Sequence, residues 1–89
     1  MNSDESDEPV SVPEEIYFLC MLHNIGATSP ERSLTFEEIV RWTMLEPSKV
    51  EQNLKILMDG NYIAMSVDSG TKKYFITVDG IRKVLSMYS

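Results

Sequence analysis

The sequence contains only one cysteine, one histidine and four glycines among its 89 residues. A single cysteine, Cys20, excludes an internal disulfide, and with only His23 near it the chain has no four-ligand metal set. No apolar run approaches the roughly 18 residues that a membrane-spanning helix requires, and the acidic amino terminus does not resemble a secretory signal. We therefore expect a cytoplasmic protein with no membrane partner, no metal and no other cofactor.

Arrangements of residues that support catalysis are missing as well. The chain has no glycine-rich phosphate loop, no paired carboxylates within an apolar stretch, and no set of nucleophile, base and orienting group. Cys20 and His23 share one helical stripe, but no third group is visible to orient them, and a cysteine is commonly a small buried hydrophobic residue. The sequence therefore predicts a protein that is not an enzyme.

Basic residues are scarce in the first third of the chain. The formal net charge is −6; residues 1–33 hold seven acidic residues and one basic residue, whereas residues 34–89 hold seven of each. Residues 1–10 are acidic and poor in apolar side chains, which predicts a disordered acidic tail before a single domain over residues 11–89. The tail either keeps the protein soluble or imitates a nucleic acid, by covering basic residues of its own domain or of a partner.

The central stretch, residues 34–63, has the pattern of two short amphipathic helices joined by a sharp corner. Thr35 and Glu38 form a capping-box pattern that starts the first helix, and Pro47 suits the first position of the second helix, which ends near Gly60. The apolar faces predicted to be buried are Phe36, Ile39, Val40 and Thr43 in the first helix, and Val50, Leu54, Leu57 and Met58 in the second. Together these features predict a helix-turn-helix.

A helix of about Val12 to Ile25, capped by Ser11, is expected before this stretch, and it is apolar nearly all round. Such a helix must be covered on two sides. One stripe consists of Ile16, Leu19, Cys20 and His23, and the other consists of Phe18, Met21, Leu22 and Ile25. A domain of this size covers one stripe, so we expect the second to be a subunit interface, with coverage by the carboxy-terminal helix alone as the alternative.

Alternating residues after the central stretch predict a β-hairpin. The strands are expected at residues 62–67 and 72–77 with a loop at residues 68–71, and a third strand at Ser33–Leu34 would support them. Thr77 is a suitable cap for a last amphipathic helix. Its apolar stripe contains Ile81, Val84, Leu85 and Tyr88.

The order of these elements and two sequence patterns resemble winged-helix DNA-binding domains. Residues 34–63 resemble the pattern L-T-x-x-E-L-A-x-x-x-x-L-s-x-s-x-V-s-x-x-L-x-x-L-x-x-x-G-x-I of that family, and residues 76–85 resemble the L-T-x-x-G-x-x-x-L segment that follows the wing in MarR-like transcription regulators. The resemblance implies an α+β fold, a small winged helix-turn-helix with a three-helix core, a β-hairpin wing and an additional C-terminal helix.

The resemblance further implies a sequence-specific regulator of transcription that binds double-stranded DNA. The helix of residues 47–58 would enter the major groove, and the wing of residues 68–73 would lie on the backbone. The DNA-binding residues would be Arg41, Ser48, Lys49, Gln52, Asn53, Lys55, Lys72 and Lys73. For Trp42 we expect a position covering the edge of the core.

A homodimer through the first and last helices is expected, with Phe18, Met21, Leu22, Ile25, Val84 and Tyr88 at its interface. Winged helices also serve as protein-interaction modules, so the alternative is a domain that binds another protein within a larger assembly, with little or no DNA binding. For that alternative, Ile56, the outer stripe of the first helix and the acidic tail would be the contacts.

Overall fold

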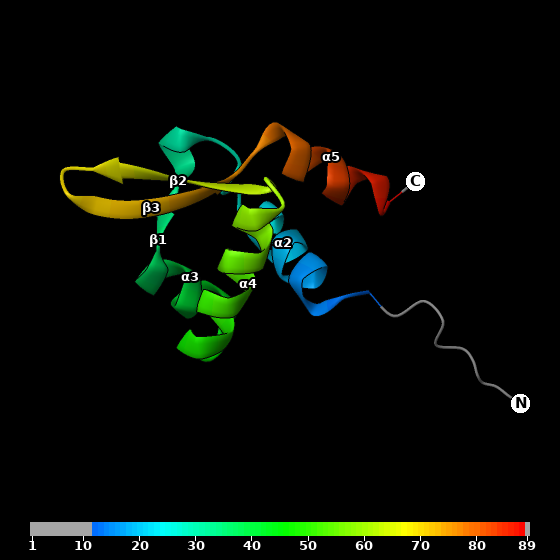
Figure 1. Cartoon of the computed structure of the whole chain (residues 1–89), viewed down its shortest axis with the longest axis horizontal. Helices are drawn as coiled ribbons and strands as arrows, with labels where there is room; N and C mark the ends of the chain where they lie inside the picture. The colour runs from blue at the N-terminus through cyan, green and yellow to red at the C-terminus, as the bar shows by residue number, and fades with distance from the viewer. Residues whose placement is uncertain (1–11, 89) are drawn as a thin grey trace, which may run out of the picture.

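Four α-helices and a three-stranded antiparallel sheet form over residues 12–88, the part of the chain that the computed structural model describes (Figure 1). The elements are α2 (Glu14–Asn24), the short 3-10 helix η2 (Pro30–Arg32), β1 (Leu34–Thr35), α3 (Phe36–Thr43), α4 (Pro47–Asp59), β2 (Ile63–Asp68), β3 (Thr71–Ile76) and α5 (Val78–Ser86). The expected α+β arrangement is confirmed. The acidic tail expected over residues 1–10 and the expected cap Ser11 lie outside the described residues.

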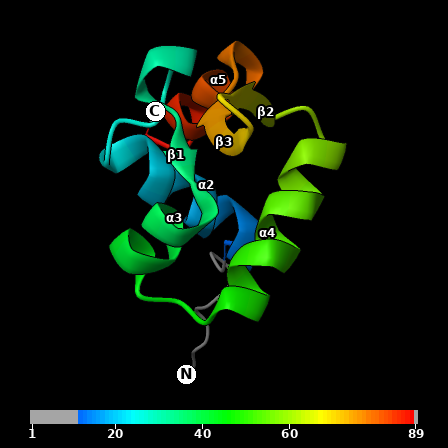
Figure 2. The ribbon, with the colours of Figure 1, turned by 90° about the vertical axis from the view of Figure 1, so that its left-hand side faces the viewer.

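Helix α2 is the centre of the core, because α3, α4, α5 and β3 all contact it (Figure 2). It begins at Glu14, two residues later than expected, with Pro13 at the N-cap and no side-chain cap. The residues completely buried around it come from every layer and include Phe18, Leu19, Leu22, Ile39, Val50 and Val84. Burial of one such side chain contributes about 1.5–3 kcal/mol.

The prediction that the second stripe of this helix is a subunit interface is therefore wrong for two of its residues. Phe18 and Leu22 were predicted to face a partner subunit, but both are completely buried within one chain. The reason is that α5 and β3 cover α2 on one side while α3 and α4 cover it on the other. Helical spacing showed that both sides need covering, but not that one short chain supplies both covers.

The expected third strand near Leu34 is present as β1, and the strand order β1-β3-β2 shows that it pairs with the last strand. Leu34 lies opposite Tyr74, and Ile63 lies opposite Ile76. The hairpin of β2 and β3 turns through Ser69 and Gly70, whose φ angles are 53° and 81°. Two positive φ angles fit the right-handed twist of the strands. The hairpin projects away from the helices, on the side opposite α5 (Figure 1).

The expected helix-turn-helix is present as α3 and α4. The Glu38 amide donates to Thr35 Oγ1 at 3.1 Å and the Thr35 amide donates to Glu38 Oε1 at 2.9 Å, which completes the predicted capping box. Helix α3 ends at Met44, which has a left-handed backbone with φ of 59°, and α4 begins with Pro47 at its first position. The left-handed methionine costs about 1–2 kcal/mol relative to a right-handed residue and was not foreseen.

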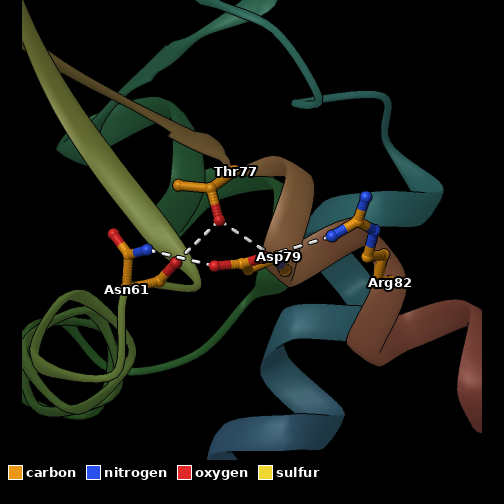
Figure 3. A network of polar contacts seen from close by, with 5 residues as sticks. Asn61, Thr77, Asp79 and Arg82 are labelled. Carbon is orange, nitrogen blue, oxygen red and sulfur yellow. Dashed lines mark hydrogen bonds and ion pairs between the residues drawn. The ribbon is translucent and has the colours of Figure 1, made fainter.

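A polar network joins the end of α4 to the start of α5 (Figure 3). Thr77 Oγ1 accepts from the Gly80 amide at 3.0 Å and donates to the Asn61 carbonyl at 2.7 Å, while Asn61 Nδ2 donates to Asp79 Oδ2 at 3.2 Å. A Cβ at Gly80 would collide with the carbonyl oxygen of Tyr62, so glycine permits the close approach of α5 to the turn before β2. Helix α5 is thereby fixed relative to α4.

Candidate nucleic-acid interface

Helix α4 presents a polar stripe to solvent on the side away from the core. Ser48, Gln52 and Lys55 are exposed and follow one another at spacings of four and three residues, which places them on one face. Val50 and Leu57, on the opposite face, are buried. Lys49 and Ile56 are exposed beside the stripe, as predicted. The helix is therefore anchored on one face and free to contact a ligand on the other.

Asn53 does not belong to this exposed surface, and its predicted contact with DNA is wrong on this ground. Its side chain is only 2% exposed, and its Nδ2 donates to Glu14 Oε2 at 3.3 Å. The start of α2 lies against this side of α4 and removes Asn53 from solvent. The two residues are 39 positions apart in the sequence, so helical spacing could not reveal the contact.

Glu14 also forms an ion pair with Lys49, at 3.5 Å between the carboxylate and the ammonium group. Both side chains are about half exposed, at 53% and 50%, so this is a surface ion pair that solvent screens. A phosphate that binds Lys49 would have to compete with the Glu14 carboxylate. Glu14 was not among the predicted site residues.

The two lysines of the hairpin lie on opposite faces of it, because neighbouring residues of a strand alternate. Lys72 shares a face with Tyr74 and with the buried Ile76, which is the face turned toward the helices. Lys73 lies on the other face and forms an ion pair with Asp68 at 3.6 Å. Lys72 is exposed and has no ion pair among residues 12–88.

Two large apolar side chains are exposed at the end of α3. Trp42 is 62% exposed, so the expectation that it covers the edge of the core is wrong, and Met44 is 88% exposed. Helix α3 has eight residues, and Ile39 is the fully buried one among them. So short a helix turns one narrow face to the core, and the Trp42 ring lies outside that face. Arg41, before Trp42, is exposed as predicted.

The charge of this surface is close to balanced. Residues 36–73 contain five basic and six acidic side chains. Two of the basic ones, Lys49 and Lys73, form the ion pairs described above, which leaves Arg41, Lys55 and Lys72 without an ion pair in the part of the chain that the structure describes. Electrostatic attraction of a polyanion by one copy of the domain is therefore weak.

The predicted dimer residues divide into three groups. Phe18, Leu22 and Val84 are completely buried in the core and cannot face a partner, whereas Met21 and Ile25 are partly buried and pack against the core. Tyr88 is exposed.

Three further apolar side chains of these helices are exposed, namely Tyr17, Val78 and Leu85. Tyr17 was not predicted, although its spacing from Met21 is one helical turn, and Leu85 was assigned to the apolar stripe of the last helix.

Neither a membrane span nor a metal site emerges from the described residues. No helix within residues 12–88 is long and apolar enough to cross a bilayer. In the same part of the chain, no group of three or more histidine, cysteine, aspartate or glutamate side chains is placed to hold a metal ion.

A helix-turn-helix followed by a β-hairpin, with the strand order β1-β3-β2, is a winged helix. Solved structures share this fold. The DNA-binding TubR fragment from Clostridium botulinum is 26% identical with a TM-score of 0.74, and the match covers 88% of this chain and 99% of that fragment. BpsR from Bordetella bronchiseptica, whose DNA binding is regulated by 6-hydroxynicotinic acid, is 21% identical with a TM-score of 0.70, over 85% of this chain and 52% of BpsR.

A mutant of MepR from S. aureus is also similar, at 21% identity and a TM-score of 0.71, over 88% of this chain and 56% of MepR. The chain thus spans just over half the length of BpsR and MepR. No protein-family model and no curated protein sequence matches it. The predicted winged-helix fold is confirmed. The TubR fragment and BpsR both bind DNA.

Proposed function

We propose that the chain is a DNA-binding transcriptional regulator that recognises a specific sequence by placing α4 in the major groove. The observation that carries this proposal is the exposed polar stripe of Ser48, Gln52 and Lys55 on a helix whose opposite face is buried in the core. A helix held in this way can enter the groove as a rigid element. The TubR fragment, which is similar over nearly its whole length, is a DNA-binding protein.

Each side chain of the surface has a contact that suits its chemistry. Gln52 can bind the N6 and N7 edge of adenine with two hydrogen bonds, and Ile56 can contact a thymine methyl group. Ser48 and Lys55 can reach phosphate or guanine. Lys72 is on the face of the hairpin that is turned toward the helices, and it would lie along the DNA backbone. Arg41, at the end of α3, would contact the DNA backbone as well.

The proposed regulator acts as a homodimer through α2 and α5, which contact one another. Both helices lie on the side of the molecule away from the hairpin (Figure 1). The apolar side chains available to a second copy are Tyr17, Met21, Leu85 and Tyr88. A two-fold dimer would read a pseudo-palindrome with half-sites about one helical turn apart.

A second candidate function, a protein-interaction module, is favoured by the exposed pair Trp42 and Met44 at the end of α3. Large apolar side chains that are exposed at one end of a helix are candidates for contact with another protein. In that case DNA binding would be weak or absent, and these two side chains would lie at the centre of the contact.

The deciding experiment is a fluorescence anisotropy titration of the intact protein with a random-sequence duplex at several salt concentrations, with its mass in solution measured alongside. We expect a dimer whose affinity falls steeply with salt. Lys55→Gln should lower the affinity and reduce the salt slope of the dimer by about 1.8, since each copy loses one phosphate contact. Arg32→Gln makes the same charge change on η2, outside the proposed DNA-binding surface and the proposed dimer helices, and should leave both unchanged. Absence of binding at low salt would transfer the assignment to the protein-interaction module.

A further inference from the structure

A pocket of about 550 Å³ lies in the corner between α4, the start of α3 and β3. Its apolar lining consists of Phe36, Leu54, Met58 and Tyr74, and its charged lining consists of Glu51, Lys55 and Asp59. Leu54 is buried and the three charged residues are exposed, so the pocket has an apolar floor and a charged rim. Its volume and mostly apolar lining are those of sites that hold small molecules.

The fold creates this corner from three directions. Tyr74 lies opposite Leu34 in the sheet, and it lines the pocket together with Phe36, the first residue after β1. Helix α4 forms the remaining wall with Leu54 and Met58, which are four residues apart and therefore on one face. Met58 was predicted to be inside the core, but it is exposed at this pocket instead.

The charges of the rim favour a cationic ligand. Glu51, Lys55 and Asp59 follow one another at intervals of four residues, which places the lysine between the two acidic residues along the same side of α4. Neither carboxylate has an ion pair among residues 12–88. The rim is therefore negative by one charge. An aromatic ring face attracts cations as well, and Phe36 and Tyr74 supply two rings.

We propose that this pocket binds a flat organic cation, with the aromatic body between Phe36 and Tyr74 and the charge near Glu51 and Asp59. If the proposed function holds, the ligand and DNA exclude one another. Lys55 belongs both to the rim and to the DNA-binding stripe, and Lys72 is on the same face of the sheet as Tyr74. A molecule in the corner thus occupies the space between α4 and the hairpin that the duplex would have to approach.

The binding test uses three bicyclic probes of similar size and different charge: 1-methylquinolinium, 1-naphthalenemethanol and 1-naphthoate. Titrations followed by fluorescence, without DNA, should give the tightest binding for the cation and the weakest for the anion. The double variant Glu51→Gln and Asp59→Asn should weaken the binding of 1-methylquinolinium about three- to tenfold, and Lys55→Glu should strengthen it. The matched control, Glu37→Gln with Glu46→Gln, removes two exposed carboxylates outside the pocket and should change nothing.

The position of the ligand is tested by NMR of the methionine methyl groups. The Met58 methyl signal should move on addition of 1-methylquinolinium, whereas the Met44 signal, from an exposed residue outside the pocket, should stay. Equal binding of the three probes would overturn the assigned charge preference, and movement of Met44 without Met58 would overturn the site.

Competition with DNA is measured separately, by adding a duplex to the protein loaded with 1-methylquinolinium. Movement of the Met58 signal to the position that it has in the duplex complex without 1-methylquinolinium supports mutual exclusion. An unchanged signal on a protein that binds the duplex overturns it while the pocket stands. A protein that binds 1-methylquinolinium at Met58 but binds no duplex at low salt would contradict the proposed function and not the pocket.

Discussion

Glu14 is the first residue of α2, and its side chain contacts the proposed DNA-binding helix α4. Removal of its charge therefore tests the docking of α4 on DNA directly. Its carboxylate is 3.5 Å from the Lys49 ammonium group and accepts a hydrogen bond from Asn53. We expect Glu14→Gln to bind duplex DNA more tightly than the natural protein. Glutamine still accepts the hydrogen bond from Asn53, so the substitution removes the charge while it preserves the packing of the two helices.

The size of the effect follows from the exposure of the pair. Two unit charges about 4 Å apart interact with about 1 kcal/mol in water, and exposed ion pairs contribute about 0.2–1 kcal/mol. Release of Lys49 should therefore increase the affinity by up to about fivefold at low salt. One new phosphate contact in each copy of the proposed dimer should also steepen the slope of log affinity against log salt concentration by about 1.8.

Folding stability should change in the opposite direction. Glu14 is in the first turn of α2, where a negative charge stabilises a helix by about 0.3–1 kcal/mol. A urea titration of Glu14→Gln should thus show a lower free energy of unfolding, while fluorescence anisotropy shows tighter binding. Glu15→Gln is the matched control, since Glu15 is in the same turn and has no ion pair among residues 12–88. If the two variants bind the duplex equally at low salt, Lys49 does not reach the phosphates and the proposed docking is wrong.

Three other substitutions separate binding from folding. Lys72→Gln should weaken binding to a random-sequence duplex by about two- to fivefold, and Lys73→Gln should weaken it less because Asp68 already holds that lysine; equal losses in anisotropy titrations would contradict the assigned faces. Asn53→Ala should lower the free energy of unfolding by about 1–3 kcal/mol in urea without changing sequence preference, and a relaxed preference would show that this side chain reads a base. Gly80→Ala should lower the midpoint of thermal unfolding, at a cost of about 1–3 kcal/mol, and a midpoint equal to that of the natural protein would mean that α5 shifts freely.

The sequence predicted those parts of the fold that depend on near neighbours. Thr35 and Glu38 form their capping box because the two residues are three positions apart, and Pro47 begins α4 because proline fixes its own backbone. The hairpin was predicted from the alternation of side chains. A third strand near Leu34 was predicted because an isolated two-stranded hairpin is marginally stable. Each of these signals is contained in a few consecutive residues.

The errors concern contacts between distant segments. Asn53 looked like an edge residue of α4, and the Glu14 carboxylate that buries it comes from another helix. Phe18 was assigned to a partner because its stripe required a cover, and the chain itself provided that cover through α5 and β3. Periodicity identifies which side chains need burial, but the neighbour that buries them is decided by the topology of the whole domain.

Formation of a dimer determines whether the proposed DNA-binding surface is strong enough to act. Arg41, Lys55 and Lys72 are the basic residues of that surface that have no ion pair among residues 12–88. Three phosphate contacts correspond to a salt slope of about −2.7, which leaves little electrostatic affinity at physiological salt. Two copies on one duplex double the number of contacts, so the slope approaches about −5.4 and the affinities of the half-sites reinforce one another. In the proposed dimer, the exposed side chains Tyr17 and Leu85 make no DNA contact themselves, but they would bring the second α4 to the same duplex.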